Sequence, residues 1–324
     1  MPKELIHFTI AEKTAQRLEG SRLARPVSNQ KEGLLLGSVF HDALFYAVLP
    51  GCHPLEKLAH KLHGARGQDT FNLIRFQADH ISSSANKDLA CAILVGLISH
   101  LYADSVMHPF VWHYTGDYYA DNDKRKSLAR QRHRALESLM DMVACPEKVR
   151  NKKYYLRTLI QQTPDIITNG LPIKRLAQET HTSPEEVTKG LEKSWQLYQT
   201  LQRLFPIPYL ARLLFSLRKV TPDFFTELTM LFYCPQLLNQ GDKLQESITF
   251  RHPVTRKEKM ITLSELIDQA ATKAAELCLQ IEDDVFSRRA INLPQTGPSM
   301  DSGLKRVPTA GMTTFSKTPY PDIS

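Results

Sequence analysis

The segment between Leu89 and Val106 is apolar around almost its whole circumference when it is read with helical periodicity. This pattern is typical of a helix that runs through the centre of a domain, and Asp88 is in position to cap its N-terminus. Proline disfavours helical backbone in the residue before it, so Pro109 predicts a helix end near His108. Helical periodicity dominates most of the chain, and we therefore expect an all-α fold.

Polar side chains recur at a four-residue spacing within this apolar segment and just after it, at His100, Asp104 and His108. Side chains four residues apart lie on one face of a helix, with Cβ atoms roughly 6 Å apart, so neighbours can bind one ion. His100 and His108 are separated by about 12 Å of helix rise, which is too far for one small ion to reach both. The spacing predicts a cluster of ions in which Asp104 can bridge. A buried polar network in a helix bundle is the alternative.

A second pair at the same spacing, His133 and Glu137, lies in an amphipathic helix that we expect over residues 124–143. Taken alone, this pair is better explained as a solvated pair on a helix surface, because Arg130 and Arg134 mark a partly exposed helix. Only the presence of the other candidate ligands makes it a candidate metal site.

Three more candidate ligands precede the central segment. Asp42 and His63 flank or follow largely apolar sequence, where an unpaired charge or imidazole would be costly and a metal would satisfy it. His7 has a plain alternative as a surface histidine near the amino terminus. We expect the remaining histidines to be surface or capping residues: His41, His53, His60, His80, His113, His181 and His252.

Two capping boxes locate helices in the second half of the chain. Ser183–Glu186 predicts a helix to about residue 204, and Thr262–Glu265 predicts one to about residue 286. Two shorter amphipathic helices are expected nearer the amino terminus, over residues 10–19 and 67–84. A loop or hairpin is expected between the two boxes, over residues 247–261.

One helical domain is expected over residues 1–291, with the metal motifs in 7–137 and additional helices in 150–287. From residue 292 to residue 324, Pro, Gly, Ser and Thr dominate and the apolar period is lost. This composition predicts a disordered tail.

Composition restricts the function only loosely. The net charge is +7, but basic residues are scattered, so phosphate-bearing substrates, membrane surfaces and nucleic acid all fit as anionic partners. Five dispersed cysteines without a CxxC motif argue against a disulfide framework and a thiolate zinc site. We see no secretory signal before His7, and the longest apolar stretch, around Leu89–Ile98, is shorter than the ~20 residues of a membrane span. A cytoplasmic protein without a transmembrane segment is expected.

The ordered series of motifs resembles the zinc-dependent phospholipase C family, which is related to the single-strand-specific zinc nucleases. The resemblance covers roughly residues 5–287, and the series is far more specific than any one motif. A weaker likeness lies at His252–Thr255 and Leu263–Leu266. The matching stretches are His7–Ala11, Gly37–Asp42, Leu62–Gly64, Val95–Asp104 with His108–Phe110, and His133–Glu137.

This resemblance implies a helical bundle whose central cleft holds two or three zinc ions. The implied ligands are Asp42, His63, His100 and Asp104 for one ion, His108, His133 and Glu137 for a second, and His7 with a shared Asp104 for a third. Secreted members use a processed amino terminus as a ligand, so we expect the third site to be weak or absent here. His41 stands where many relatives have proline.

The resulting hypothesis is hydrolysis of a phosphodiester, most simply a phospholipid head group, by metal-activated water, with Asp42 and Asp104 as the catalytic carboxylates. Peripheral contact with a membrane surface would fit such a substrate. A nuclease on the same metal site is one alternative. A non-catalytic helical module that binds metal or senses lipid is the other, and its coordination sphere would be closed.

Overall fold

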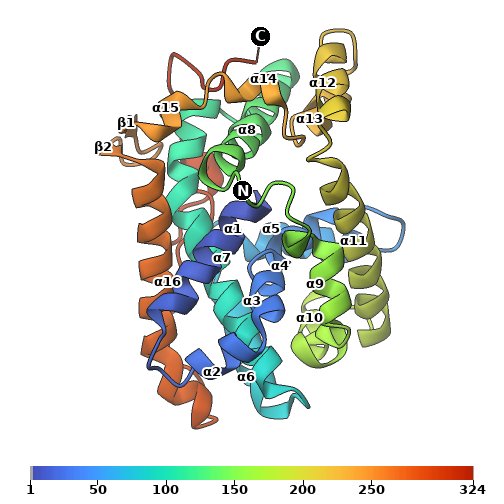
Figure 1. Ribbon diagram of the computed structural model, residues 1–324. Coiled ribbons are helices and arrows are strands. Elements are labelled where there is room, and N and C mark those ends of the chain that lie inside the picture. The colour runs from blue at the N-terminus through green and yellow to red at the C-terminus, as the bar shows by residue number, and fades with distance from the viewer. Residues whose placement is uncertain (1–2, 324) are drawn as a thin grey trace.

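The computed structural model describes residues 3–323, and they form the all-α protein that the sequence predicts. Figure 1 shows a long helix, α7 (Lys87–Thr115), at the centre of the molecule. The helices that pack most closely on it come from both ends of the chain: α1 (Glu4–Arg17), α2 (Ala24–Asn29), α3 (Lys31–Gly37), α6 (Asn72–Ser83) and α16 (Leu263–Phe286). The metal-ligand candidates on α7 therefore lie at the centre of the domain.

By length and composition alone, α7 could cross a membrane. However, 94% of its apolar window is buried inside the protein. This burial is that of a core helix, as its apolar circumference predicts.

Both ends of α7 differ from the prediction. The N-cap is Asn86, whose side chain accepts a hydrogen bond from the backbone N–H of Leu89 at 3.1 Å, and Asp88 already lies in the first turn. Pro109 does not end the helix, which continues to Thr115. Proline removes only one helical hydrogen bond, to the carbonyl four residues earlier, and the helix is buried on both sides of that position, so packing outweighs the loss.

The other long helices begin where their sequence signals place them. α8 (Asp123–Ala144) matches the predicted amphipathic helix within one residue at each end. α11 (Pro184–Leu204) and α16 each begin with a complete capping box, built on Ser183 and Thr262. Residues 247–261, expected to form a loop or a hairpin, form a hairpin in which β1 (Ile248–Arg251) pairs antiparallel with β2 (Glu258–Ile261).

Short elements complete the fold. The two short amphipathic helices expected near the amino terminus correspond to α1, which begins earlier than predicted, and to α6, which begins later than predicted. The remaining α-helices are α4 (Phe40–Ala43), α5 (His53–Leu62), α9 (Leu156–Gln162), α10 (Ile173–Thr180), α12 (Pro208–Leu217), α13 (Asp223–Thr229), α14 (Pro235–Leu238) and α15 (Asp242–Gln245). Single turns lie at η1 (Leu44–Tyr46), η2 (Lys152–Tyr154), η3 (Ile166–Gly170) and η4 (Thr309–Gly311).

Glycines bring α3 and α7 into backbone contact. A Cβ atom added at Gly96 would lie 2.7 Å from the backbone nitrogen of Ser38 and 2.8 Å from the carbonyl carbon of Gly37, closer than side chains approach backbone atoms in proteins. This contact fixes the end of α3 against α7 one turn before His100. It therefore sets the position of a candidate metal ligand.

The predicted disordered tail is wrong for the described residues 292–323. Met300 and Tyr320 are buried in the core, and backbone hydrogen bonds tie this segment to the domain, from Met300 N–H to the His63 carbonyl and from Thr309 N–H to the Ala65 carbonyl, both at 3.0 Å. The composition of the segment predicted disorder because its sequence has no helical or strand period. It is stabilised instead by separate apolar anchors and by backbone pairing with loops of the domain.

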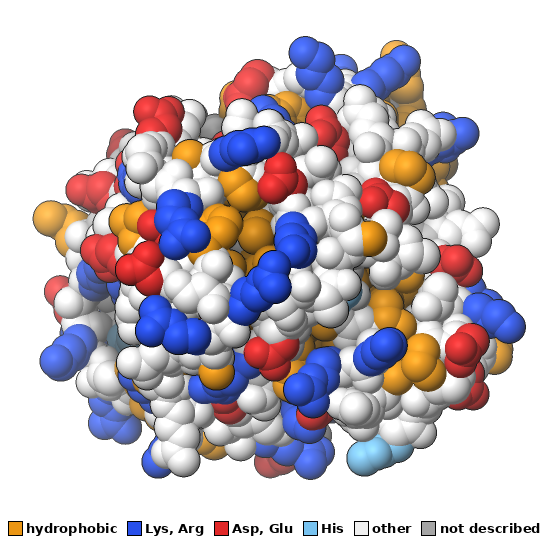
Figure 2. Space-filling view, turned by 90° about the horizontal axis from the view of Figure 1, so that it is seen from below, with side chains coloured by type: hydrophobic (Ala, Val, Ile, Leu, Met, Phe, Trp, Pro, Cys, Tyr) orange, Lys and Arg blue, Asp and Glu red, His pale blue; other side chains and the backbone are white. Residues whose placement is uncertain are grey.

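The surface charges are dispersed. Figure 2 shows the molecule from below, where Lys and Arg side chains are spread over the face with Asp and Glu between them. The positive net charge therefore forms no single block on this face, in agreement with its scattering along the sequence.

Candidate metal centre

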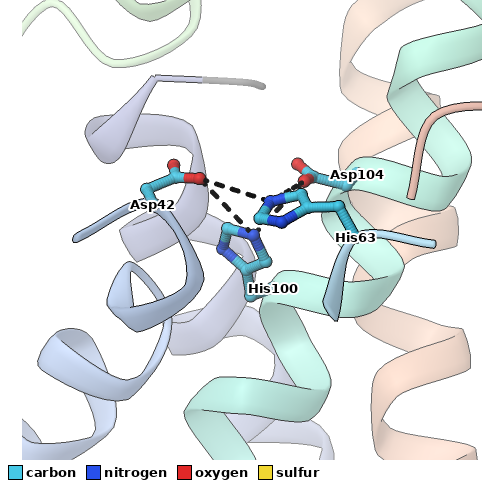
Figure 3. A group of neighbouring side chains, drawn as sticks. All are labelled: Asp42, His63, His100 and Asp104. Atoms are coloured by element: carbon cyan, nitrogen blue, oxygen red, sulfur yellow. Dashed lines mark ion pairs between the residues drawn. The ribbon is translucent and has the colours of Figure 1, made fainter. Parts of the chain in front are cut away.

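Four of the predicted ligands converge in a first group. Asp42 comes from α4, His63 directly follows α5, and His100 and Asp104 lie one turn apart on α7 (Figure 3). One ligand atom from each residue lies within 4.8 Å of those of the other three. The shortest approach joins His100 Nε2 to Asp104 Oδ2 at 3.2 Å, and His63 Nε2 lies 3.8 Å from that same oxygen. All four residues are buried.

Three more predicted ligands form a second group farther along α7. His108 from α7 meets His133 and Glu137 from α8, and their ligand atoms also lie within 4.8 Å of one another. Glu137 Oε1 lies 3.0 Å from His133 Nε2 and 3.7 Å from His108 Nε2. The four-residue spacings on both helices place these side chains on facing surfaces, so the i,i+4 pair on α8 is buried and not solvated.

His7 lies beside the first group. Its Nε2 atom is 3.5 Å from Asp104 Oδ1 and 3.7 Å from Asp42 Oδ2, and its ring stacks on that of His100 with 4.2 Å between centroids. The ring is completely buried, so the surface-histidine alternative is excluded. Asp104 thus faces His100 with one oxygen and His7 with the other, as expected for a bridging carboxylate.

Backbone carbonyls orient three of the imidazoles. The Nδ1 atoms of His63, His100 and His108 donate to the carbonyls of Ala59, Ser38 and Met300 at 2.7, 2.8 and 2.6 Å. A hydrogen bond at Nδ1 fixes the tautomer in which Nε2 is unprotonated and able to bind a metal. In each case Nε2 is the atom that points into its group.

Several buried atoms that could bind a metal have no hydrogen-bond partner within residues 3–323. This holds for both oxygens of Asp104 and for Nε2 of His7, His63, His100 and His108. Leaving so many polar atoms unsatisfied would cost several kcal/mol, roughly 1–3 for each group. Imidazole nitrogen and carboxylate oxygen are ligands that zinc prefers. The residues present therefore fit zinc ions, and a polar network closed by its own hydrogen bonds does not account for them.

Burial and neighbouring charges favour the ligating forms of His7, His133 and Asp104 in the metal-free protein, whereas Asp104 and Asp42 outweigh burial at His100 and raise the pKa of that imidazole. Burial lowers the pKa of His7 and of His133 to about 4, which keeps both imidazoles neutral at pH 7. Burial alone would raise the pKa of Asp104, but the neighbouring His100 and His108 outweigh it and hold that pKa well below its usual range. A neutral imidazole beside an ionised carboxylate is the protonation state that a cation needs.

His41 was not among the predicted ligands, and its assignment to the surface is wrong. Its ring is completely buried and stacks on His100 with 4.5 Å between centroids, beside the 4.2 Å stack of His7 on that same imidazole. Neither ring nitrogen has a hydrogen-bond partner in the described chain. The one sequence signal for its burial was its position next to the predicted ligand Asp42. In the structure, every residue of α4 is buried.

The other excluded histidines fit the expectation in part. His53, His60 and His181 are exposed, and His80 and His252 are half-buried, whereas His113 is buried near the end of α7. An acidic residue of the C-terminal segment also reaches the site: Asp301 Oδ1 lies 3.8 Å from His108 Nδ1. Because residues 292–324 were expected to be disordered, Asp301 was not considered as a residue of the site.

Aromatic side chains surround the second group. The rings of Trp112 and Tyr118 meet that of His133 edge to face, with centroids 5.7 and 5.4 Å away, and Tyr119 stacks on Trp112 at 6.0 Å. Tyr119 is among the exposed apolar side chains of the molecule. The aromatic cluster therefore extends from a buried candidate ligand to the surface.

The fold and the two groups define a class: an all-α protein with paired His and carboxylate clusters buried along a central helix. Comparison with protein families identifies that class more closely, because the zinc-dependent phospholipase C family matches residues 6–189. The chain belongs to this family. The match covers every predicted ligand and ends before α12, α13 and the C-terminal segment. Comparisons with curated proteins and with solved structures give no match.

Proposed function

We propose that this protein is a zinc-dependent hydrolase that cleaves phosphodiester bonds, with a phospholipid head group as the substrate class. The observation that carries the proposal is the pair of buried ligand groups, separated along α7 by the single turn from Asp104 to His108. Family membership supports a phospholipase C-type reaction, and the two donor sets support two or three zinc ions.

Zinc bound in these groups would activate a water molecule for attack and neutralise charge on the phosphate oxygens. The first group would use Asp42, His63, His100 and Asp104, the second His108, His133 and Glu137, and a third ion would use His7 with Asp104. His41 adds an imidazole stacked on His100, so it acts by holding that ring in place.

Asp42 and Asp104 have different roles in this proposal. Asp104 is completely buried and faces His100 with one oxygen and His7 with the other, so it links the first group to His7. Asp42 keeps slight exposure and lies at the edge of the first group. It is therefore the carboxylate placed to orient the attacking water and to accept its proton.

The test is release of phosphocholine from phosphatidylcholine by the zinc-loaded protein, beside a soluble chromogenic phosphodiester and single-stranded DNA. We expect turnover of phosphatidylcholine and of the chromogenic phosphodiester, and a decrease of about 10²-fold or more in kcat for Asp42→Asn. Glu56→Gln is a suitable control, because that carboxylate lies on α5 outside both groups.

Failure to hydrolyse any substrate while zinc is bound would contradict the proposal and favour a structural metal site. Cleavage of single-stranded DNA alone, with strong salt dependence, would replace the phospholipid with nucleic acid as substrate.

A further inference from the structure

Large apolar side chains gather on the surface of the hairpin formed by α12 and α13. The most exposed are Tyr209 at 83%, Val220 at 81%, Phe224 at 71% and Leu213 at 57%. Elsewhere in residues 3–323 such exposed side chains occur singly or as a neighbouring pair. We call these four residues, together with Leu217, the apolar tip. It lies outside the part of the chain that matches the family.

The arrangement of the apolar tip follows from helix geometry. Tyr209, Leu213 and Leu217 are spaced by four residues and lie along one face of α12. The other face holds Ala211, which is buried, and Leu214, which packs against the core. α12 is thus apolar on both sides, and only one side is covered by this chain.

Basic side chains flank the apolar tip. Residues 203–225 contain Arg203, Arg212, Arg218 and Lys219 against one acidic residue, Asp223, a net charge of +3. Arg212 and Lys219 are exposed beside the apolar side chains. Aromatic and aliphatic side chains bordered by Arg and Lys are typical of segments that insert into the interface of an anionic membrane.

The hairpin is firmly attached to the helix of the second ligand group. Glu227 at the base of α13 accepts a hydrogen bond from Ser127 of α8 at 2.8 Å and lies 3.7 Å from Arg134 of the same helix. The Thr226 hydroxyl donates to the Arg218 carbonyl at 3.1 Å and closes the turn between α12 and α13. These contacts join the hairpin that carries the apolar tip to α8.

The geometry points to a phospholipid bilayer with anionic lipids as the occupant of this surface. Figure 1 shows α12 and α13 as a projection at one corner of the molecule, a convex shape that a lipid interface can accommodate. A second copy of the chain would bring two positively charged hairpins together, which like-charge repulsion opposes. This inference rests on the proposed function, because a docking surface for a bilayer suits an enzyme that acts on phospholipids. Binding to vesicles can nevertheless be measured separately from turnover.

The experiment measures co-sedimentation of the zinc-loaded full chain with vesicles of phosphatidylcholine alone and of phosphatidylcholine with phosphatidylserine. The test variant is Leu213→Ser/Val220→Ser/Phe224→Ser. A matched control is Val48→Ser/Met260→Ser/Leu279→Ser, which removes exposed apolar side chains elsewhere. We expect the test variant to bind the mixed vesicles about 100-fold more weakly and the control to bind like the parent.

Charge reversal provides a second variant. Arg212→Glu/Lys219→Glu should weaken binding to the mixed vesicles about 10-fold or more and remove the preference over pure phosphatidylcholine. The proposal is overturned if the parent does not sediment with the mixed vesicles, or if the test variant binds as tightly as the parent. It is also overturned if sedimentation equilibrium without vesicles shows a dimer that only the test variant loses.

A soluble chromogenic phosphodiester separates this proposal from the proposed function. Turnover of the soluble substrate at the parent rate by the test variant, with loss of vesicle binding, supports the docking surface. Turnover by a parent that never binds vesicles overturns the docking surface alone. Binding by a parent that hydrolyses no substrate leaves the docking surface supported and contradicts the proposed hydrolase.

Discussion

Replacing Gly96 with alanine should disturb both the fold and the metal centre. The added Cβ atom would lie 2.7 Å from the backbone nitrogen of Ser38, whereas 3.4 Å is the lower bound of ordinary contact. The obstacle is the backbone of α3, so no side-chain rotation can relieve the clash. The Ser38 carbonyl accepts the hydrogen bond from His100 Nδ1, and a shift of α3 therefore moves the group that orients a ligand.

The size of the effect follows from two opposing contributions. Overpacking in a core costs about 1–3 kcal/mol, and a clash with several backbone atoms belongs at the upper end. Replacing glycine by alanine inside a helix recovers about 1 kcal/mol. We expect Gly96→Ala to lower the free energy of unfolding by about 2 kcal/mol. Zinc affinity should fall by about 10- to 100-fold, as when an outer-shell partner is lost.

Gly33→Ala is the matched control on the same pair of helices. There the nearest atom is the terminal Cδ1 of Leu89, at 2.5 Å, and a side chain can rotate away. A rotamer change costs about 1 kcal/mol, which the gain in helix propensity offsets. Urea unfolding with and without zinc, and competition with a zinc chelator, measure both quantities. If Gly96→Ala matches the parent in stability and affinity, or Gly33→Ala is equally destabilised, the reasoning is refuted.

Two further predictions concern the surroundings of the metal centre. Gly303→Ala should lower zinc affinity about 10-fold or more, because its Cβ would collide with the Ser105 carbonyl oxygen and displace the segment whose Met300 carbonyl holds His108. Gly20→Ala, at a similar positive φ but with open space around it, should leave the affinity unchanged in the same chelator competition. The second prediction concerns buried His7, whose pKa is lowered to about 4. Between about pH 6.5 and about pH 4 this imidazole is protonated in the unfolded chain but neutral in the folded chain. The metal-free protein should therefore lose stability as the pH falls from about 6.5 to about 4. His7→Asn should lose less stability between pH 7 and pH 5 in urea unfolding, and an identical loss would contradict the assignment.

The sequence predicted the parts of the fold that have local causes. α8, α11 and α16 begin and end near their predicted positions because capping boxes and amphipathic periods act within a few residues. The four-residue spacings on α7 and α8 also predicted which side chains share a helix face. The ordered motifs indicated which segments meet, and the structure brings them together in two groups.

What the sequence missed depends on contacts between distant segments. His41 is buried because all four residues of α4 are enclosed by the rest of the domain, and its position next to Asp42 was the one local sign of this. The helix break predicted at Pro109 did not occur because burial of α7 on both sides outweighs one lost hydrogen bond. The C-terminal segment is held by backbone bonds to distant loops such as that of His63, and a composition without period gives no sign of such bonds.

The most direct test of the central claim is an anomalous diffraction map recorded at the zinc absorption edge from crystals of the zinc-loaded protein. We predict at least two peaks, each about 2.0–2.2 Å from imidazole nitrogens and carboxylate oxygens. If zinc-loaded crystals show no peak in the first group and none in the second, the claim is contradicted. The two predicted positions are enclosed by Asp42, His63, His100 and Asp104, and by His108, His133 and Glu137.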